Sequence, residues 1–342
     1  GGGTALIGDP GGKSTERPFV EQAVVAEQCQ KMEAGVRQFV TGDVTFVNNY
    51  DWLSKLSMIE YLRDIGKHFT VNAMIKKDIV ANRLDSENPI SYTEFSYSLL
   101  QGYDYVHLHK EFHCDVQIGG SDQWSNIIAG VDLIRRSTGD EVYAITNPII
   151  TDKATGKKFG KSEGNAIWLN AEKTSPYQFY QFWLNTSDES VIEYLKIFTF
   201  LSLEEISELE ENWKQNPGER EAQKRLAMEV TTFVHGEQSM NAASEVSGVL
   251  FGDAPISEAS AQAQAMILET APTHKTSVGS ALVDVLVETE LATSKREART
   301  FVEDGAVYLD GKQITDIEHT VSDSPVQLLK RGKKQLCVLQ VK

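Results

Sequence analysis

Residues 91–124 read SYTEFSYSLLQGYDYVHLHKEFHCDVQIGGSDQW, and this stretch decides the fold class. Apolar residues recur at helical spacing over 91–109, and a short strand-like run follows at 115–118. Paired glycines then lead into a second helical pattern over 122–136. A strand between two helices is typical of an α/β domain with a parallel sheet. We therefore predict such a domain here.

The residues before this stretch continue the alternation of helices and strands. Four further elements are predicted: helices over 19–39, 55–65 and 71–84, and a strand over 44–47. The predicted α/β domain thus covers 1–150. Its start is a glycine-rich turn that is typical of the interior of a domain, so we expect an N-terminal segment to be missing.

Four more parts follow the α/β domain. A Lys- and Gly-rich connection over 151–175 leads into a helical domain over 176–252. Residues 253–277 are rich in Ala, Ser, Thr and Gln and have little periodicity, so we predict a flexible linker.

The last part, 278–342, has the pattern of a compact α+β unit. One helix is predicted over 281–288, and a second begins at the capping box Ser294-x-x-Glu297 and ends at Gly305. Strands are predicted over 306–309 and 335–341, the first ending in an Asp310-Gly311 turn.

Composition places the chain among globular proteins. Its 342 residues suffice for two or three domains, and 41% apolar residues exclude a disordered or collagen-like chain. The net charge of -16 repels nucleic acid, so such a partner must be held by local basic patches. Cys29, Cys114 and Cys337 form no CxxC pair, which favours a reducing, cytoplasmic setting. No apolar run approaches the ~20 residues that cross a bilayer, and no secretory signal is evident.

Three polar side chains share one face of the long predicted helix. Tyr97, Gln101 and Asp104 stand at i, i+4 and i+7, which places them within an arc of roughly 60°. A solvent-facing polar stripe is the simplest alternative, but the neighbours Phe95 and Leu99 indicate a largely buried helix. Buried polar groups need partners, and a zwitterionic or phenolic ligand supplies them.

Two loops have compositions that suit a nucleotide. Residues 117–124, QIGGSDQW, lie where a strand ends and a helix begins, which is where α/β sheets bind ligands. Asp122 either accepts from ribose hydroxyls or caps the helix, and the local sequence leaves both open. Residues 157–162, KKFGKS, can bring three lysines onto a polyphosphate during reaction, although a lysine run is also typical of a solvated loop.

Other binding motifs are not supported. Gly12-Lys13-Ser14 lacks the glycine that a P-loop needs five positions earlier, where Ile7 stands. The N-terminal glycines lack the third glycine of a dinucleotide fingerprint, where Leu6 stands. One cluster of metal-ligand types is more simply explained as exposed residues near a helix end: His107, His109, His113 and Cys114. We predict no bound metal.

Taken in order and spacing, five motifs resemble those of bacterial tyrosyl-tRNA synthetases. They are Gly8-Asp9-Pro10, Thr93 to Tyr105, Gln117 to Trp124, Lys158 to Ser162, and Ser175 to Trp183. The likeness covers essentially the whole chain, and its C-terminal part is similar to the S4 RNA-binding fold. The resemblance implies a Rossmann-like catalytic domain, truncated at its N-terminus, then a helical domain and an S4-like RNA-binding domain.

The resemblance also implies a reaction, that of a class I synthetase. The tyrosine carboxylate attacks the α-phosphate of ATP to give tyrosyl-adenylate and pyrophosphate, and the tyrosyl group then passes to the 3′-terminal ribose of tRNA(Tyr). Positioning and charge stabilisation provide the catalysis. ATP is used with Mg²⁺, no cofactor is tightly bound, and a cytoplasmic homodimer without membrane contact is expected.

Matching positions receive roles from the resemblance. The tyrosine-binding residues would be Asp9, Tyr97 and Gln101 at the α-amino group, Asp104 at the phenol, and Gln117 and Gln123 beside them. The ATP-binding residues would be Gly120 and Asp122 at the ribose, the signature-loop residues Lys158, Lys161 and Ser162 at the reacting phosphates, and Lys13 and Arg17 at the pyrophosphate.

The sequence departs from the family in one large respect. No H-x-G-H motif occurs in it, and losing preorganised transition-state donors costs about 10² to 10³ each in rate. We therefore expect the chain as written to be inactive and the longer protein to be active. Smaller departures are Ser125, where glycine is usual, and Phe159-Gly160 within the lysine signature.

The C-terminal unit is the expected RNA contact. Residues 276–342 hold nine basic and ten acidic residues, so the rest of the chain carries nearly all of the net charge of -16. The predicted RNA-binding residues form a helix cluster and a turn cluster: Lys295, Arg296 and Arg299, and Lys330, Arg331, Lys333 and Lys334. Such clusters are often only solvated faces, and the S4 likeness favours RNA.

Two other functions remain as alternatives. A tryptophanyl-type synthetase shares the fold and the adenylation step, but is not expected to combine Asp104 with the Tyr97 and Gln101 face. A non-catalytic RNA-binding protein with a degenerate synthetase body is disfavoured by the intact set Asp9, Tyr97, Gln101, Asp122 and Lys161.

Overall fold

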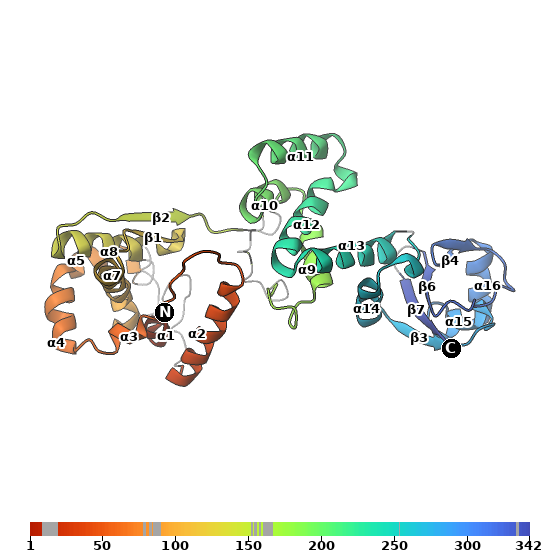
Figure 1. Ribbon diagram of the computed structural model, residues 1–342, viewed down its shortest axis with the longest axis horizontal. Helices are drawn as coiled ribbons and strands as arrows, with labels where there is room; N and C mark the ends of the chain where they lie inside the picture. The colour runs from red at the N-terminus through yellow and green to blue at the C-terminus, as the bar shows by residue number, and fades with distance from the viewer. Residues whose placement is uncertain are drawn as a thin grey trace. The chain divides into compact units, whose positions relative to one another are not determined.

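The computed structural model describes most of the chain, in two compact units, Gly1–Thr151 and Asp152–Lys342 (Figure 1). The described residues are 1–8, 20–77, 80–81, 84, 90–151, 153, 156, 159, 167–252, 254–332 and 335–342. Among them, no helix is both long and apolar enough to span a bilayer.

The first unit contains the predicted helix, strand and helix. α7 (Tyr92–Phe112) begins at a capping box between Ser91 and Glu94, β1 (Val116–Gly120) follows, and a short turn η3 (Ser121–Gln123) leads into α8 (Trp124–Ser137). β2 (Tyr143–Asn147) then pairs with β1 in parallel, from Val116 opposite Tyr143 to Gly120 opposite Asn147. The α/β prediction is confirmed.

α7 and α8 pack closely because glycine lies at their contact. A Cβ atom on Gly130 would lie 2.8 Å from Cβ of Tyr105, and one on Gly102 would lie 3.4 Å from the backbone of Ala129. The Tyr105 ring is fully buried, and its hydroxyl donates to the Tyr143 carbonyl at 2.8 Å. The helix pair is thereby tied to β2.

The residues before α7 form helices and turns. They are α1 (Gly2–Ile7), α2 (Gln22–Arg37), α3 (Tyr50–Leu53), α4 (Met58–Glu60), a π-helical turn η1 (Tyr61–Ile65), η2 (Gly66–His68) and α5 (Val71–Met74). The strand predicted over 44–47 is wrong. Val44 and Val47 are exposed there, and β-branched residues form a strand only where a neighbouring strand and a core are available.

The second unit begins with the predicted helices. They are α9 (Pro176–Leu184), α10 (Val191–Phe198), α11 (Leu203–Gln215), the turn η4 (Pro217–Glu219), α12 (Glu221–His235) and α13 (Glu237–Phe251). α9 and α11 both begin at capping boxes, the second at the predicted pair Ser202 and Glu205. α9, α12 and α13 pack against one another, and Phe179, Leu226 and Ala243 are buried on them.

The predicted flexible linker over 253–277 is replaced by regular structure in its described residues. A turn η5 (Ile256–Glu258) precedes α14 (Ala261–Thr270), and β3 (Thr273–Thr276) pairs in parallel with the last strand. Ala263 and Ile267 are fully buried, so two side chains suffice to dock a helix made mostly of good helix formers.

The C-terminal α+β part is built as predicted, with strands that the pattern missed. α15 (Leu282–Glu288) and α16 (Lys295–Glu303) share a core with a sheet of order β3-β7-β6-β4-β5. Its other strands are β4 (Val307–Leu309), β5 (Lys312–Ile314), β6 (Val326–Arg331) and β7 (Gln335–Val341). Asp310 and Gly311 both have positive φ, as a tight β4–β5 hairpin requires.

Candidate active site

A buried carboxylate lies at the centre of the polar face of α7. Asp104 is 9% exposed, and each of its carboxylate oxygens accepts one hydrogen bond. Asn49 Nδ2 donates to Oδ2 at 2.7 Å, and Trp52 Nε1 donates to Oδ1 at 2.7 Å. A carboxylate can accept more than one donor on each oxygen, so it can still receive a ligand hydroxyl.

Burial raises the pKa of Asp104 above its usual range, while the hydrogen bonds from Asn49 and Trp52 oppose the rise. Both donors favour the charged form, which has acceptors only. The two side chains therefore fix the geometry of the carboxylate and support its ionised state.

Asn49 is itself held by the first helix. Its Nδ2 also donates to Thr4 Oγ1 at 2.9 Å, and its Oδ1 accepts from Gly3 N at 2.8 Å. Neither Asn49 nor Trp52 is predicted from the sequence, because they lie 55 and 52 residues before Asp104 in an irregular stretch. No local periodicity points to them.

Tyr97 and Gln101 lie on the same helix as Asp104, and both are half-buried. At 1.5 Å per residue, Tyr97 and Asp104 are separated by about 10 Å along the helix axis. One polar face thus offers donors and acceptors to both ends of a ligand of amino-acid size.

The turn after β1 is shaped by two close contacts. A Cβ atom on Gly120 would lie 2.7 Å from Asp122 Oδ1, and one on Gly119 would lie 3.0 Å from Ile127 Cδ1. Asp122 is exposed, and in residues 120–124 no side chain caps η3 or α8. Of the two readings that the sequence left open for Asp122, helix capping is therefore not supported.

Two glutamines flank this turn with different surroundings. Gln117 Oε1 is buried and has no hydrogen-bond partner among the described residues. A buried acceptor without a donor is costly, and a ligand donor removes that cost. Gln123 Oε1 accepts from Asn126 Nδ2 at 3.1 Å, which orients its side chain at the start of α8.

The basic residues of the C-terminal part differ in their partners. Arg296 and Arg299 are exposed on α16, whereas Lys295 pairs with Asp284 at 2.7 Å. The Arg331 guanidinium lies 4.6 Å from the Phe301 ring centroid.

Lys330 is engaged inside the second unit. Its Nζ donates to the carbonyls of Val249 and Gly252, at 2.8 and 2.6 Å. Lys330 therefore caps the C-terminal end of α13, and the structure separates its role from that of the exposed arginines.

Some predicted site residues lie outside the described residues. They are Asp9, Lys13, Arg17, Lys158, Lys161, Ser162, Lys333 and Lys334. Within the described part of the chain, no three His, Cys, Asp or Glu side chains gather as a metal site.

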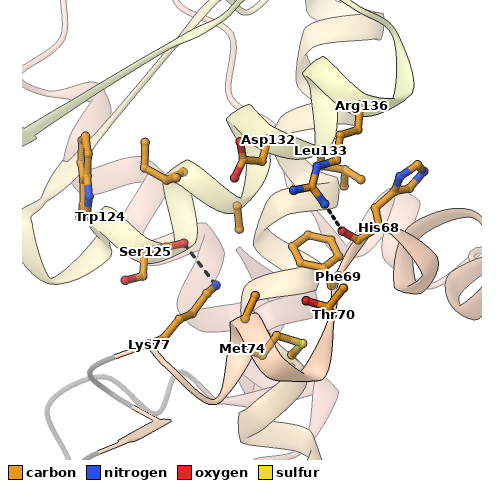
Figure 2. A pocket seen from close by; sticks show the side chains of 13 residues that line it. His68, Phe69, Thr70, Met74, Lys77, Trp124, Ser125, Asp132, Leu133 and Arg136 are labelled. Atoms are coloured by element: carbon orange, nitrogen blue, oxygen red, sulfur yellow. Dashed lines mark hydrogen bonds between the residues drawn. The ribbon is translucent and has the colours of Figure 1, made fainter.

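A separate cavity of about 270 Å³ lies between α8 and the residues around α5 (Figure 2). Lys77 Nζ donates to the Ser125 carbonyl at 3.5 Å across it, and burial lowers the pKa of that amine. None of the predicted site residues lines this cavity, so it is distinct from the polar face of α7.

Comparison with known proteins finds two family matches, which together cover most of the chain. Residues 1–252 match the family described as tRNA synthetases class I (W and Y), and residues 261–339 match the tyrosine–tRNA ligase SYY-like C-terminal domain.

Similar proteins are identical to this chain at close to half of the aligned positions. The tyrosine–tRNA ligase of Bacillus velezensis is 48% identical over 349 residues, which cover 98% of this chain and 82% of that protein. Tyrosine–tRNA ligase 1 of Bacillus subtilis is 46% identical over 356 residues, covering 100% of this chain and 83% of that protein.

A solved structure agrees with the fold. The C-terminally truncated mitochondrial tyrosyl-tRNA synthetase of Aspergillus nidulans is 31% identical with a TM-score of 0.60, over 72% of this chain and 73% of that one. The chain therefore belongs to the class I tRNA synthetases of the tryptophan and tyrosine family and, within it, to the tyrosine–tRNA ligases.

Proposed function

We propose that this chain is a tyrosine–tRNA ligase that activates L-tyrosine with ATP and charges tRNA(Tyr). The observation that carries the proposal is the buried Asp104 carboxylate, which lies on the same helix as Tyr97 and Gln101. Hydrogen bonds from Asn49 and Trp52 fix this carboxylate. This face has an acceptor for a phenol at one end and polar groups for an α-amino group at the other.

Tyrosine is recognised by both of its ends. Asp104 accepts a hydrogen bond from the phenol hydroxyl, while Tyr97, Gln101 and Asp9 bind the ammonium group. Phenylalanine offers no hydroxyl and fills the space without donating, so a buried charged acceptor is deprived of its ligand donor. Specificity for tyrosine over phenylalanine follows from that unmet acceptor.

Adenylate formation takes place at the turn after β1. Asp122 accepts from the ribose of ATP, and Gly120 leaves the space that its backbone needs for close approach. A tyrosine carboxylate oxygen bonds to the α-phosphorus, and the bond from this phosphorus to the bridging oxygen breaks, releasing pyrophosphate. The carboxylate and the acyl phosphate lie beside Gln117 and Gln123.

Positive charge stabilises the phosphates as they separate. The side chains proposed for this task are Lys158, Lys161 and Ser162 of the signature loop, with Lys13 and Arg17 at the pyrophosphate. ATP enters with Mg²⁺ as its counterion. A ribose hydroxyl of tRNA then attacks the tyrosyl carbonyl carbon and AMP leaves, so no enzyme-bound covalent intermediate is needed.

The tRNA is bound by the C-terminal part. Its cations suit phosphate contact, and the proposed set is Lys295, Arg296, Arg299, Arg331, Lys333 and Lys334. The free cysteines Cys29, Cys114 and Cys337 suit the reducing cytoplasm, where we place the reaction.

Tyrosine-dependent exchange of labelled pyrophosphate into ATP tests the proposal. We compare the chain as given with the same chain joined to an N-terminal segment that carries H-x-G-H, taken from a family member. Since no H-x-G-H occurs in the 342 residues, we expect exchange only in the joined form, and with tyrosine but not with tryptophan. A folded joined form that exchanges with neither amino acid would refute the ligase function and favour RNA binding alone.

A further inference from the structure

An aromatic cluster of the helical domain encloses one residue of the signature loop (residues 157–162). The cluster consists of Phe182 and Trp183 of α9 and Tyr194 and Phe198 of α10. The Phe159 ring centroid lies 5.8, 5.6, 5.6 and 5.3 Å from theirs, in that order.

The geometry of these contacts is that of a specific binding pocket for one ring. Phe159 stacks on Trp183 at an interplanar angle of 26° and meets the edges of Phe182 and Tyr194 at 80° and 83°. Stacked and edge-to-face pairs at such distances are the favourable arrangements of aromatic rings. Three of them converge on Phe159, and Phe198 adds a fourth ring contact at a tilted angle of 36°.

The pocket is part of the buried core of the domain. Trp183 and Tyr194 are 3% and 4% exposed, and the Trp183 and Phe198 ring centroids lie 4.9 Å apart. The cluster therefore has packing partners of its own besides Phe159, so it presents a fixed surface to the loop.

The short sequence separation from Phe159 limits the positions that the two lysines can take. Phe159 directly follows Lys158 and stands two residues before Lys161. Consecutive Cα atoms are 3.8 Å apart, so a separation of two residues along any chain spans at most about 7.6 Å. A ring held in the cluster therefore restricts where both amines can reach, and less positional freedom has to be lost when they meet a polyphosphate.

We propose that Phe159 is a positioning residue of the adenylation reaction, which anchors the signature loop to α9 and α10 so that Lys158 and Lys161 meet the phosphates of ATP. The inference rests on the proposed function. Beyond that function, the inference assigns a role to Phe159: through this residue the helical domain, and not the sheet, sets the position of the two lysines.

Three variants separate anchoring from general stabilisation. Phe159→Ala removes the ring, Phe159→Leu keeps an apolar side chain in the cluster, and Phe200→Ala is the matched control. Phe200 lies in the same domain but is 87% exposed, and its ring faces Phe233 instead.

The first measurement uses the chain as given and needs no activity. Limited trypsin digestion reports cleavage after Lys157, Lys158 and Lys161, with cleavage after Lys224 in α12 as the internal measure of global unfolding. We expect Phe159→Ala to speed loop cleavage at least about tenfold relative to the α12 site, Phe159→Leu to be intermediate, and Phe200→Ala to match the parent.

The second measurement is pyrophosphate exchange in the form that carries the H-x-G-H segment. We expect Phe159→Ala to lower kcat at least about tenfold while the KM for tyrosine stays unchanged, with partial rescue in Phe159→Leu. Two results would contradict the proposed role of Phe159. One is loop cleavage in Phe159→Ala that rises only in step with cleavage in α12, and the other is an unchanged kcat. Absent exchange in the unsubstituted form that carries the H-x-G-H segment would instead refute the proposed function. The digestion experiment would still test whether Phe159 anchors the loop.

Discussion

A carboxylate that is both buried and doubly hydrogen-bonded sets the chemistry of the site at the scale of single residues. Burial raises the pKa of Asp104, and the donors Asn49 and Trp52 counteract it. Asparagine at position 104 has one acceptor oxygen for the two donors and carries no charge. Hydrogen bonds to charged groups contribute about 1.5–3 kcal/mol each.

We expect Asp104→Asn to weaken tyrosine binding by roughly 10- to 150-fold, the equivalent of that free energy, and to reduce discrimination against phenylalanine. Equilibrium dialysis with both amino acids measures the change. Asp132→Asn is the control, since the half-buried Asp132 pairs with Arg135 on α8 and lines the separate cavity, which Asp104 does not line. Unchanged tyrosine affinity in Asp104→Asn would contradict the assigned role.

The raised pKa of Asp104 also gives the affinity a pH dependence. The ionised carboxylate is the form that accepts from the phenol, so affinity is full above the pKa of the folded state and falls as pH drops through it. The fall should therefore begin at a higher pH than an ordinary aspartate, with a pKa of about 3.9, would give, and it should be missing from Asp104→Asn.

Local sequence was enough to predict the polar face of α7, because its residues Tyr97, Gln101 and Asp104 follow helical periodicity on one element. It was insufficient for Asn49 and Trp52, which reach Asp104 only through tertiary packing across more than 50 residues. Their polar atoms carry no periodic signal of their own.

At the scale of elements, the close packing of α7 on α8 contributes to the stability of the first unit. A methyl group on Gly130 would meet Tyr105 Cβ at 2.8 Å, a distance that forces the helices apart. We expect Gly130→Ala to lower the free energy of unfolding by about 1–3 kcal/mol, measured by urea denaturation. Gly35→Ala in α2 meets nothing within 4 Å and should instead be neutral or gain up to about 1 kcal/mol. Equal effects at both positions would show that the helix contact does not limit stability.

The end of α13 is stabilised by a side chain from β6. Lys330 Nζ donates to the carbonyls of Val249 and Gly252, and a charged donor is favourable at a helix C-terminus. We expect Lys330→Met to destabilise the chain by about 1.5–3 kcal/mol in urea denaturation, since two carbonyls lose a charged donor. Lys312→Met on the exposed face of β5 should change little, and equal losses in both variants would contradict the capping role.

Elements were predictable where caps and periodicity agree, and not where packing decides. Ser294 with Glu297 begins α16, and the Asp310-Gly311 pair turns the hairpin, both as their residue types require. The 253–277 stretch has no amphipathic stripe, yet Ile267 and Ala263 dock α14 and β3 completes a sheet. Val44 and Val47 are strand formers without a sheet to join.

The order of an α/β part, a helical part and an α+β part along the chain agrees with the sequence-based expectation at the scale of the whole molecule. A neutral C-terminal part on a strongly acidic chain is the arrangement expected where one end has to meet a polyanion.

We propose a homodimer because the first unit exposes large apolar side chains over a short range. Met58, Ile59, Leu62 and Val71 are 77%, 69%, 51% and 61% exposed, and Tyr92 at the start of α7 is 68% exposed. Monomeric proteins rarely leave so many large apolar groups in water unless a partner covers them.

Ile59→Asp combined with Leu62→Asp should therefore convert the dimer to a monomer, because two carboxylates would be buried without partners at the interface. Sedimentation velocity measures the mass of each species. Met32→Asp is the matched control: its side chain is 69% exposed, but it lies on α2, apart from the 58–71 stretch in sequence, and the dimer should persist. A parent chain that sediments as a monomer, or a Met32→Asp variant that dissociates equally, would show that this stretch is not the interface.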